Sequence, residues 1–234
     1  MGLEGLRGRW ERVIRPLVAR MGGVEPCTLT WLTLPLALWA CYLITTAGRD
    51  QEGAFRLVGG TLLVLLASVL DAMDGNIART HGKTTRYGDY LDHTIDRVVD
   101  IALLLAIGHN AAWVPNAVWG WAAALATLFG SYMGTQAQSV GLGRNYGGFG
   151  RADRLAVILL AMILAAIQAS TGWSDPVWLG IGWNPLLGAV LISFIGGLWT
   201  FIVRFGAARV DLQRLDAHEP LTQTENGSIE DDGE

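Results

Sequence analysis

Long apolar runs alternate with short charged segments along this chain. A helix needs about 20 predominantly apolar residues to cross a bilayer, and five runs meet this need, at 28–47, 53–70, 110–143, 155–173 and 176–203. A sixth helix is predicted whose second half is the apolar run 101–108 and whose first half carries acidic residues. The pattern therefore predicts an all-α integral membrane fold with six transmembrane helices.

Both ends of the chain differ from this apolar middle. Residues 3–21 interleave apolar residues with Arg7, Arg9, Arg12, Arg15 and Arg20, which predicts a basic amphipathic helix on the membrane surface. Residues 216–234 hold seven acidic residues and no Lys or Arg, a composition typical of disordered segments. We expect three parts: an amphipathic juxtamembrane helix (1–22), a six-helix transmembrane catalytic domain (23–210) and an acidic, disordered cytoplasmic tail (211–234).

The basic residues predict the orientation of the chain. With six spans, 14 of the 17 Lys and Arg residues fall on one side of the membrane, and only Arg49 and Arg56 fall on the other. Because cytoplasmic segments carry the excess of Lys and Arg, we expect a multi-pass protein of the cell membrane with both termini in the cytoplasm.

Composition narrows the class of protein. The chain is 51% hydrophobic and 16% charged, with a mean hydropathy of +0.35, which excludes a nucleic-acid binder, a disordered protein and a disulfide scaffold. Cys27 and Cys41 lie in or beside an apolar run and are expected to be free thiols. The ten Trp residues, Trp113 among them, are expected to form a belt at the membrane interface.

Four acidic residues cluster where the second predicted span ends and the third begins. Asp71 and Asp74 are spaced i, i+3, and Asp92 and Asp96 are spaced i, i+4, so each pair lies on one helical face. If the two helices are antiparallel neighbours, the four carboxylates converge at the cytoplasmic side. Charged residues within membrane spans mark function by default.

Carboxylates this close need protonation or a compensating cation. Hard oxygen ligands without His or Cys suit Mg²⁺ or Mn²⁺, and two such ions form a clamp used for displacement at phosphorus. Gly75 leaves room for a close approach of backbone or ligand, and Arg79 carries a planar guanidinium that can grip a phosphate.

The same residues resemble the signature of the CDP-alcohol phosphotransferase family, D-x2-D-G-x2-A-R-x8-G-x3-D-x3-D. Eight fixed positions over 26 residues agree without a gap, and the likeness extends over residues 1–210. The resemblance implies a divalent-metal-dependent enzyme of phospholipid biosynthesis that moves the lipid phosphate group of a CDP-linked lipid, a phosphatidyl or archaetidyl donor, to an alcohol and releases CMP.

The resemblance also implies roles for individual residues. Asp71, Asp74, Asp92 and Asp96 would hold two metal ions, and Asp96 would also act as the general base. The CDP-lipid would contact Thr30, Gly75, Ala78, Arg79, Thr85 and Gly88. Pro26-Cys27-Thr28-Leu29-Thr30 resembles the family element P-N-x-x-T, with Cys27 in place of the usual Asn. Members are commonly homodimers.

The acceptor is expected to enter near the fourth and fifth spans. That region resembles the inositol-phosphate and glycerol-phosphate branches of the family, but Gly134, Gln136 and Gln138 replace two basic residues and an acid. Arg144, Arg151 and Arg154 remain as candidates to bind a phosphate, which favours inositol phosphate or glycerol phosphate as acceptor. An unphosphorylated alcohol such as serine is the alternative.

Two other classes of membrane protein hold clusters of acidic residues. Intramembrane prenyltransferases bind Mg²⁺-pyrophosphate through Asp motifs far apart in sequence, unlike this single hairpin. Cation transporters place acids near the bilayer midplane, often in repeated halves, whereas here the acids gather at one face and no repeat is evident.

Overall fold

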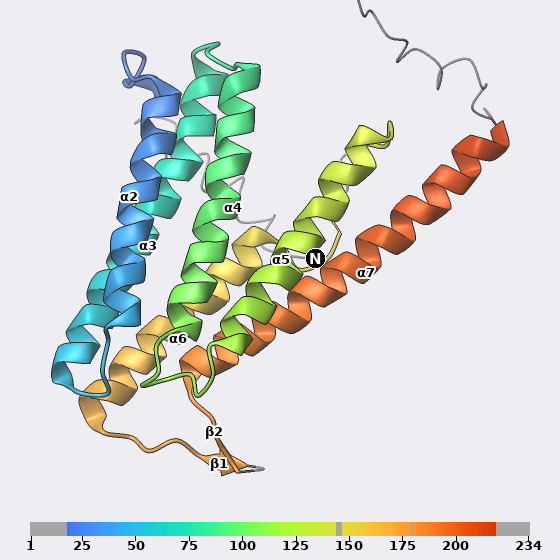
Figure 1. Ribbon diagram of the computed structural model, residues 1–234. Coiled ribbons are helices and arrows are strands. Elements are labelled where there is room, and N and C mark those ends of the chain that lie inside the picture. Colours follow the sequence, from blue (N-terminus) through green and yellow to red (C-terminus); the bar gives the residue numbers. More distant parts are fainter. Residues whose placement is uncertain (1–17, 144–146, 179, 219–234) are drawn as a thin grey trace, which may run out of the picture.

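The protein is described by a computed structural model over residues 18–143, 147–178 and 180–218. Long helices dominate these residues (Figure 1). They are α2 (Pro26–Thr45), α3 (Gln51–Thr80), α4 (Arg86–Gly108), α5 (Val118–Ser139), α6 (Arg151–Thr171) and α7 (Pro185–His218). Most of the surface helix expected at 3–21, and Arg144, lie outside the described residues.

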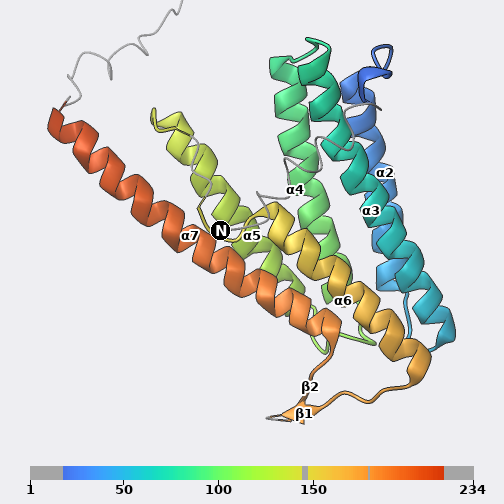
Figure 2. The same cartoon turned by 180° about the vertical axis from the view of Figure 1, so that it is seen from behind.

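The helices form two groups that meet along α4 and α6. α2 packs along both α3 and α4, and α5 packs along α7. α4 then contacts α5, while α6 contacts α3 and α7 (Figures 1 and 2). Helix α2 packs against both α3 and α4, whose acidic ends lie close to each other.

Glycine permits the closest helix contacts. A Cβ atom added to Gly108 of α4 would lie 2.5 Å from the Cα of Gly120 in α5, and one added to Gly197 of α7 would lie 2.7 Å from the backbone of Ala126 in α5. Small residues let membrane helices approach closely and gain van der Waals contact. These two contacts attach α5 to both of its neighbours.

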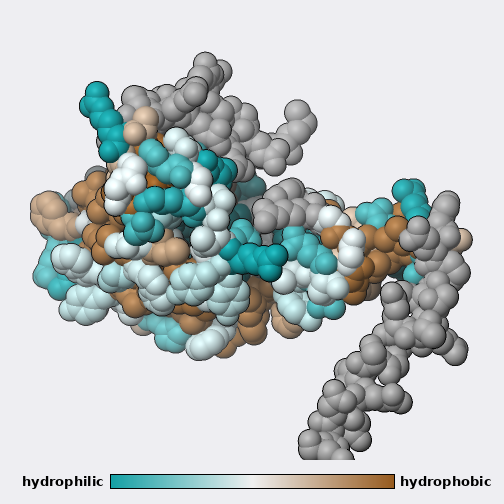
Figure 3. Space-filling model, turned by 90° about the horizontal axis from the view of Figure 1, so that it is seen from above, coloured by the Kyte–Doolittle hydropathy of each residue, from teal (hydrophilic) through white to brown (hydrophobic). Residues whose placement is uncertain are grey.

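Among the described residues, four helices are long and apolar enough to cross a membrane, namely α2, α3, α6 and α7. α4 falls short because its first half carries the acidic cluster, and α5 because Gly, Ser, Thr and Gln dilute its apolar residues. Figure 3 looks down on the end where α3 connects to α4 and shows hydrophilic residues gathered there. The helical membrane fold predicted from the sequence is therefore present.

The last predicted span begins later than expected. Two short strands, β1 (Val177–Trp178) and β2 (Ile181–Gly182), pair antiparallel before the last helix. Gly180 has a φ of +74°, a left-handed conformation that favours glycine. Helix α7 starts only at Pro185, where Asn184 Oδ1 accepts a hydrogen bond from the Leu187 amide at 3.0 Å.

The far end of α7 is also different from the prediction. The helix continues to His218, so residues 211–218 are helical and not disordered. This segment combines good helix formers with alternating charges, and local propensity favours helix even though the net composition is acidic. The 34 residues extend about 51 Å, more than the roughly 30 Å thickness of a bilayer core.

A polar network closes the end of the molecule where β1 and β2 lie. Trp113 is 1% exposed, and its Nε1 donates to the carbonyl of Ala47 at 3.1 Å. Arg49 lies over the Trp113 ring at 4.6 Å and bonds Asp175 at 2.8 Å. Trp113 is therefore a core residue, and its expected place in the interfacial belt is wrong. Cys27 and Cys41 are free thiols, as predicted.

Candidate active site

Three of the four signature aspartates meet in space. Oxygen atoms of Asp71 on α3 and of Asp92 and Asp96 on α4 all lie within 4.8 Å of one another. Asp96 is 7% exposed. Thr85 caps the start of α4, where its hydroxyl accepts a hydrogen bond from the Gly88 amide at 2.9 Å. The turns of α4 that carry Asp92 and Asp96 follow this cap and face α3. Three carboxylates at this distance need protonation or a compensating positive charge.

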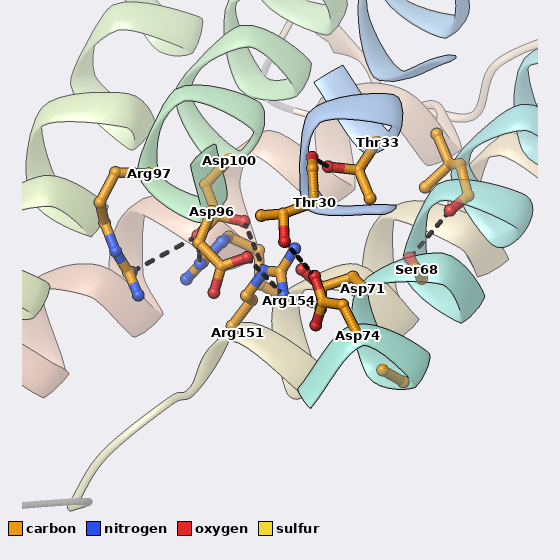
Figure 4. Close-up of polar contacts among 12 residues, drawn as sticks. Thr30, Thr33, Ser68, Asp71, Asp74, Asp96, Arg97, Asp100, Arg151 and Arg154 are labelled. Carbon is orange, nitrogen blue, oxygen red and sulfur yellow. Dashed lines mark hydrogen bonds and ion pairs between the residues drawn. The ribbon is translucent and has the colours of Figure 1, made fainter. Parts of the chain in front are cut away.

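Arg151 supplies positive charge at this position. Its Nη1 lies 2.6 Å from Asp71 Oδ2 and 2.7 Å from Asp96 Oδ1 (Figure 4). The contact with Asp96 is an ion pair that lacks hydrogen-bond geometry. The sequence placed Arg151 with the acceptor, whereas the structure places its guanidinium against the predicted metal ligands.

The donor set fits a hard divalent cation. Asp71, Asp92 and Asp96 offer converging carboxylate oxygens, and no soft ligand lies in this group. Mg²⁺ and Mn²⁺ prefer such oxygens. A cation at this point would take over the role that the Arg151 charge has in the structure.

Asp74 faces a different neighbour. Its Oδ2 accepts a hydrogen bond of 2.6 Å from the Thr30 hydroxyl of α2, and both side chains are buried (Figure 4). The carboxylate therefore lies one helical turn from Asp71, toward α2. This explains how a threonine 44 residues away in sequence belongs to the same site.

A small cavity of about 150 Å³ lies beside Asp74 and Asp92. All six residues that the resemblance assigned to the CDP-lipid line it: Thr30, Gly75, Ala78, Arg79, Thr85 and Gly88. Cys27 lines it as well, and a Cβ added to Gly88 would meet Thr85 Oγ1 at 3.1 Å and the Cys27 thiol at 3.8 Å. The predicted donor residues are therefore gathered around one cavity.

A larger cavity of about 700 Å³ opens between α4, α5, α6 and α7. Its lining includes five arginines and one acid, Asp89. The five are Arg86, Arg97, Arg151, Arg154 and Arg204. The acceptor candidates Arg151 and Arg154 therefore share a cavity, while Arg144 lies outside the described residues.

Arg154 is held by a buried acid. The side chain is 3% exposed, and its Nη2 forms a short ion pair with Asp100, which is 2% exposed. Arg97 lies 3.6 Å from the same carboxylate. Lys83 pairs with Glu25 at 2.8 Å.

Arg204 is a site residue that the sequence did not reveal. Its Nε donates to the carbonyl of Gly147 and its Nη1 to the carbonyl of Gly130, at 3.0 and 2.9 Å. It lies on α7, 50 residues beyond Arg154, and the sequence indicated only a role in orientation. No local motif marks it, because only the packing of α7 on α5 brings it to the cavity.

Comparison with known proteins agrees with the signature. Residues 24–208 match the CDP-alcohol phosphatidyltransferase family. The phosphatidylinositol phosphate synthase of Cutibacterium acnes is 32% identical over 180 residues, which are 73% of this chain and 84% of that protein. The archaetidylinositol phosphate synthase of Pyrococcus horikoshii is 30% identical over 151 residues, 62% of this chain and 73% of that protein.

Solved structures share the fold. The crystal structure of Mycobacterium tuberculosis phosphatidylinositol phosphate synthase with CDP-DAG bound has a TM-score of 0.63 and 22% identity, covering 84% of this chain and 94% of that chain. The same protein in complex with manganese and citrate has a TM-score of 0.60 and 23% identity, covering 84% of this chain and 87% of that chain.

Proposed function

The chain belongs to the CDP-alcohol phosphatidyltransferase family, and we propose that it transfers the lipid phosphate group of a CDP-linked lipid to inositol phosphate and releases CMP. The observation that carries this proposal is the position of the acidic cluster between the small cavity beside Asp74 and the large arginine-lined cavity. Family membership excludes the prenyltransferase and transporter alternatives.

The small cavity is the proposed donor site. Arg79 and Lys83 both line it, so cationic groups stand near the pyrophosphate that the donor would bring. Gly75 and Gly88 keep its wall free of side chains, which lets the ligand approach the backbone closely. The structural relative from M. tuberculosis holds CDP-DAG, which supports a donor of this class.

The aspartates are the proposed metal ligands. Asp71, Asp92 and Asp96 would hold the cations together with Asp74, and Mg²⁺ or Mn²⁺ would supply neutralisation of charge on the transferred phosphoryl group. A pair of ions is the arrangement we infer from four carboxylates. The manganese complex of the M. tuberculosis relative supports this class of cofactor.

Asp96 is the proposed general base. It lies one turn from Asp92, which lines the donor cavity, and contacts Arg151, which lines the larger cavity. From there its carboxylate can accept the proton of an acceptor hydroxyl while the new oxygen–phosphorus bond forms. The bond that breaks is the one between that phosphorus and the bridging oxygen, which leaves with CMP.

The larger cavity is the proposed acceptor site. Five arginines line it, and guanidinium groups suit phosphate. Arg97, Arg151 and Arg154 also pair with acids that do not line the cavity. Neutral α5 residues such as Ser131, Thr135 and Gln138 line the facing wall and can contact hydroxyl groups. Both features favour a phosphorylated polyol over serine. The names of the relatives, a phosphatidylinositol phosphate synthase and an archaetidylinositol phosphate synthase, support the same choice.

The membrane arrangement completes the proposal. We infer that α4 and α5 also cross the bilayer, giving six spans, because α4 packs along α2 and α5 packs along α7, and α2 and α7 are apolar enough to do so. The basic residues would then place the active site and both termini in the cytoplasm. The amphipathic helix at 1–22, the catalytic domain at 23–210 and a homodimeric assembly remain predictions.

One experiment tests the proposed function. Purified protein in detergent or vesicles is incubated with CDP-diacylglycerol or its archaeal diether analogue, Mg²⁺ or Mn²⁺, and one acceptor. The acceptors are inositol phosphate, inositol, glycerol phosphate and serine, and released CMP is measured. We expect release that depends on metal and is fastest with inositol phosphate. Faster release with serine or inositol would refute the acceptor, and no release with any acceptor would refute the reaction.

A further inference from the structure

The glycine-rich connection between α5 and α6 is fastened to α7 through one threonine. Thr200 Oγ1 accepts a hydrogen bond from the Phe149 amide at 2.8 Å and lies 3.1 Å from the Phe149 carbonyl, to which it can donate. The hydroxyl also lies 2.7 Å from the carbonyl of Gly196, one turn earlier in α7. Thr200 is 4% exposed, so water cannot readily replace these bonds.

The surrounding glycines make this contact possible. Gly148 has a φ of +98°, and a Cβ added there would lie 2.7 Å from Thr200 Oγ1. A Cβ added to Gly196 would lie 2.4 Å from the Phe149 ring. The Gly148 backbone therefore lies directly against Thr200, and the Phe149 ring lies directly against the Gly196 backbone.

The segment held by Thr200 leads directly into the first turn of α6, which carries Arg151. Phe149 is followed by Gly150, which caps α6, and then by Arg151 at the first position of that helix. Arg151 contacts Asp71 and Asp96, and it lines the large cavity together with Phe149 and Thr200. The orientation of the first turn of α6 thus depends on where Phe149 is held.

We propose that Thr200 is a positioning residue for the acceptor site, a role that rests on the function proposed above. Its hydroxyl holds Phe149 on α7 and so keeps Arg151 at the junction of the acidic cluster and the acceptor cavity. Arg204, one turn further along α7, donates to Gly147 and holds the same connection at a second point. The donor cavity is lined by α2, α3, α4 and the connection between α3 and α4, and Thr200 is not among its lining residues.

The test is Thr200→Val, which keeps the shape of the side chain and removes the hydroxyl. We expect the acceptor KM to rise about 10-fold, equivalent to about 1.4 kcal/mol, with the CDP-lipid KM unchanged. Thr200→Ser keeps the hydroxyl and should restore a KM close to that of the wild type. Thr61→Val is the matched control, because Thr61 is equally buried and its hydroxyl donates to Leu57 within α3.

Amide hydrogen exchange provides a readout that needs no activity. In Thr200→Val, residues 147–150 should exchange faster than in Thr61→Val, while α3 exchanges alike in both proteins. An acceptor KM and an exchange pattern equal to those of the control would overturn the proposal. If the wild-type protein releases no CMP, the proposed function fails, and the exchange comparison still decides whether Thr200 holds the connection.

Discussion

The hydrogen bond between Thr30 and Asp74 provides the sharpest test of the donor side of the site. Thr30→Val removes the hydroxyl that donates to Asp74 Oδ2 at 2.6 Å and keeps the shape of the side chain. The two residues are 3% and 4% exposed, so water cannot readily take the place of the donor. The Asp74 carboxylate would be left buried with one partner fewer.

The magnitude follows from the charge and the burial of this bond. A hydrogen bond to a charged group contributes about 1.5–3 kcal/mol, which corresponds to a factor of roughly 10 to 100. We therefore expect kcat/KM for the CDP-lipid to fall by that factor, with little change in the acceptor KM. Thr30→Ser keeps the hydroxyl and should recover most of the loss.

The assay is CMP release at saturating metal and acceptor while the CDP-lipid is varied. Thr33→Val is the control, because Thr33 is also buried in α2 and its hydroxyl donates to the Thr30 carbonyl at 2.7 Å, within the helix. Thermal unfolding of both variants separates catalysis from folding. A Thr30→Val enzyme within twofold of the Thr33→Val enzyme would refute the role of this bond.

Three further predictions concern the cluster and the opposite end of the molecule. Asp96→Asn should abolish turnover but preserve CDP-lipid binding, as measured by equilibrium binding; turnover near the wild-type rate would contradict its role as base. Removal of divalent ions with a chelator should stop CMP release, and Mg²⁺ or Mn²⁺ should restore it; activity that persists in chelator would disprove metal dependence. The hydrogen bond from Arg49 lowers the pKa of Asp175 below its ordinary value of 3.8. This bond should therefore stabilise the fold above pH 3.8 and lose its effect as the pH falls through the lowered pKa. The melting temperatures of wild type and Asp175→Asn should differ at neutral pH and converge in acid, and a difference that grows in acid would contradict the assigned sign.

Much of the fold and the centre of the site could be predicted from local sequence. Apolar runs mark helices because a bilayer offers no partner for an exposed backbone. The spacing of Asp71, Asp74, Asp92 and Asp96 predicted a cluster of four carboxylates, since helical periodicity puts each pair on one face. Three of them converge, and Asp74 instead accepts a hydrogen bond from Thr30. The signature also identified residues such as Thr85 and Gly88 that line the donor cavity.

Other features depended on contacts between distant segments. The composition predicts Trp113 as an interfacial residue, yet its indole is buried, donates to the Ala47 carbonyl and lies under the Arg49 guanidinium. The two short strands β1 and β2 lie within an apolar run, and Gly180 between them has a left-handed backbone conformation. The apolar character of a segment does not tell whether a Trp is buried or interfacial, or whether the chain forms a helix or a strand pair.

The sequence by itself determined the helical membrane architecture, the family signature and the acidic cluster, because each depends on periodicity or spacing within a short stretch of chain. Only the tertiary structure decided which cation faces those acids and which elements enclose the acceptor cavity. Arg151, Arg204 and Thr200 reach the site through the packing of α6 and α7 on the other helices. Such packing joins residues far apart in the chain, and no local pattern encodes the distance between them.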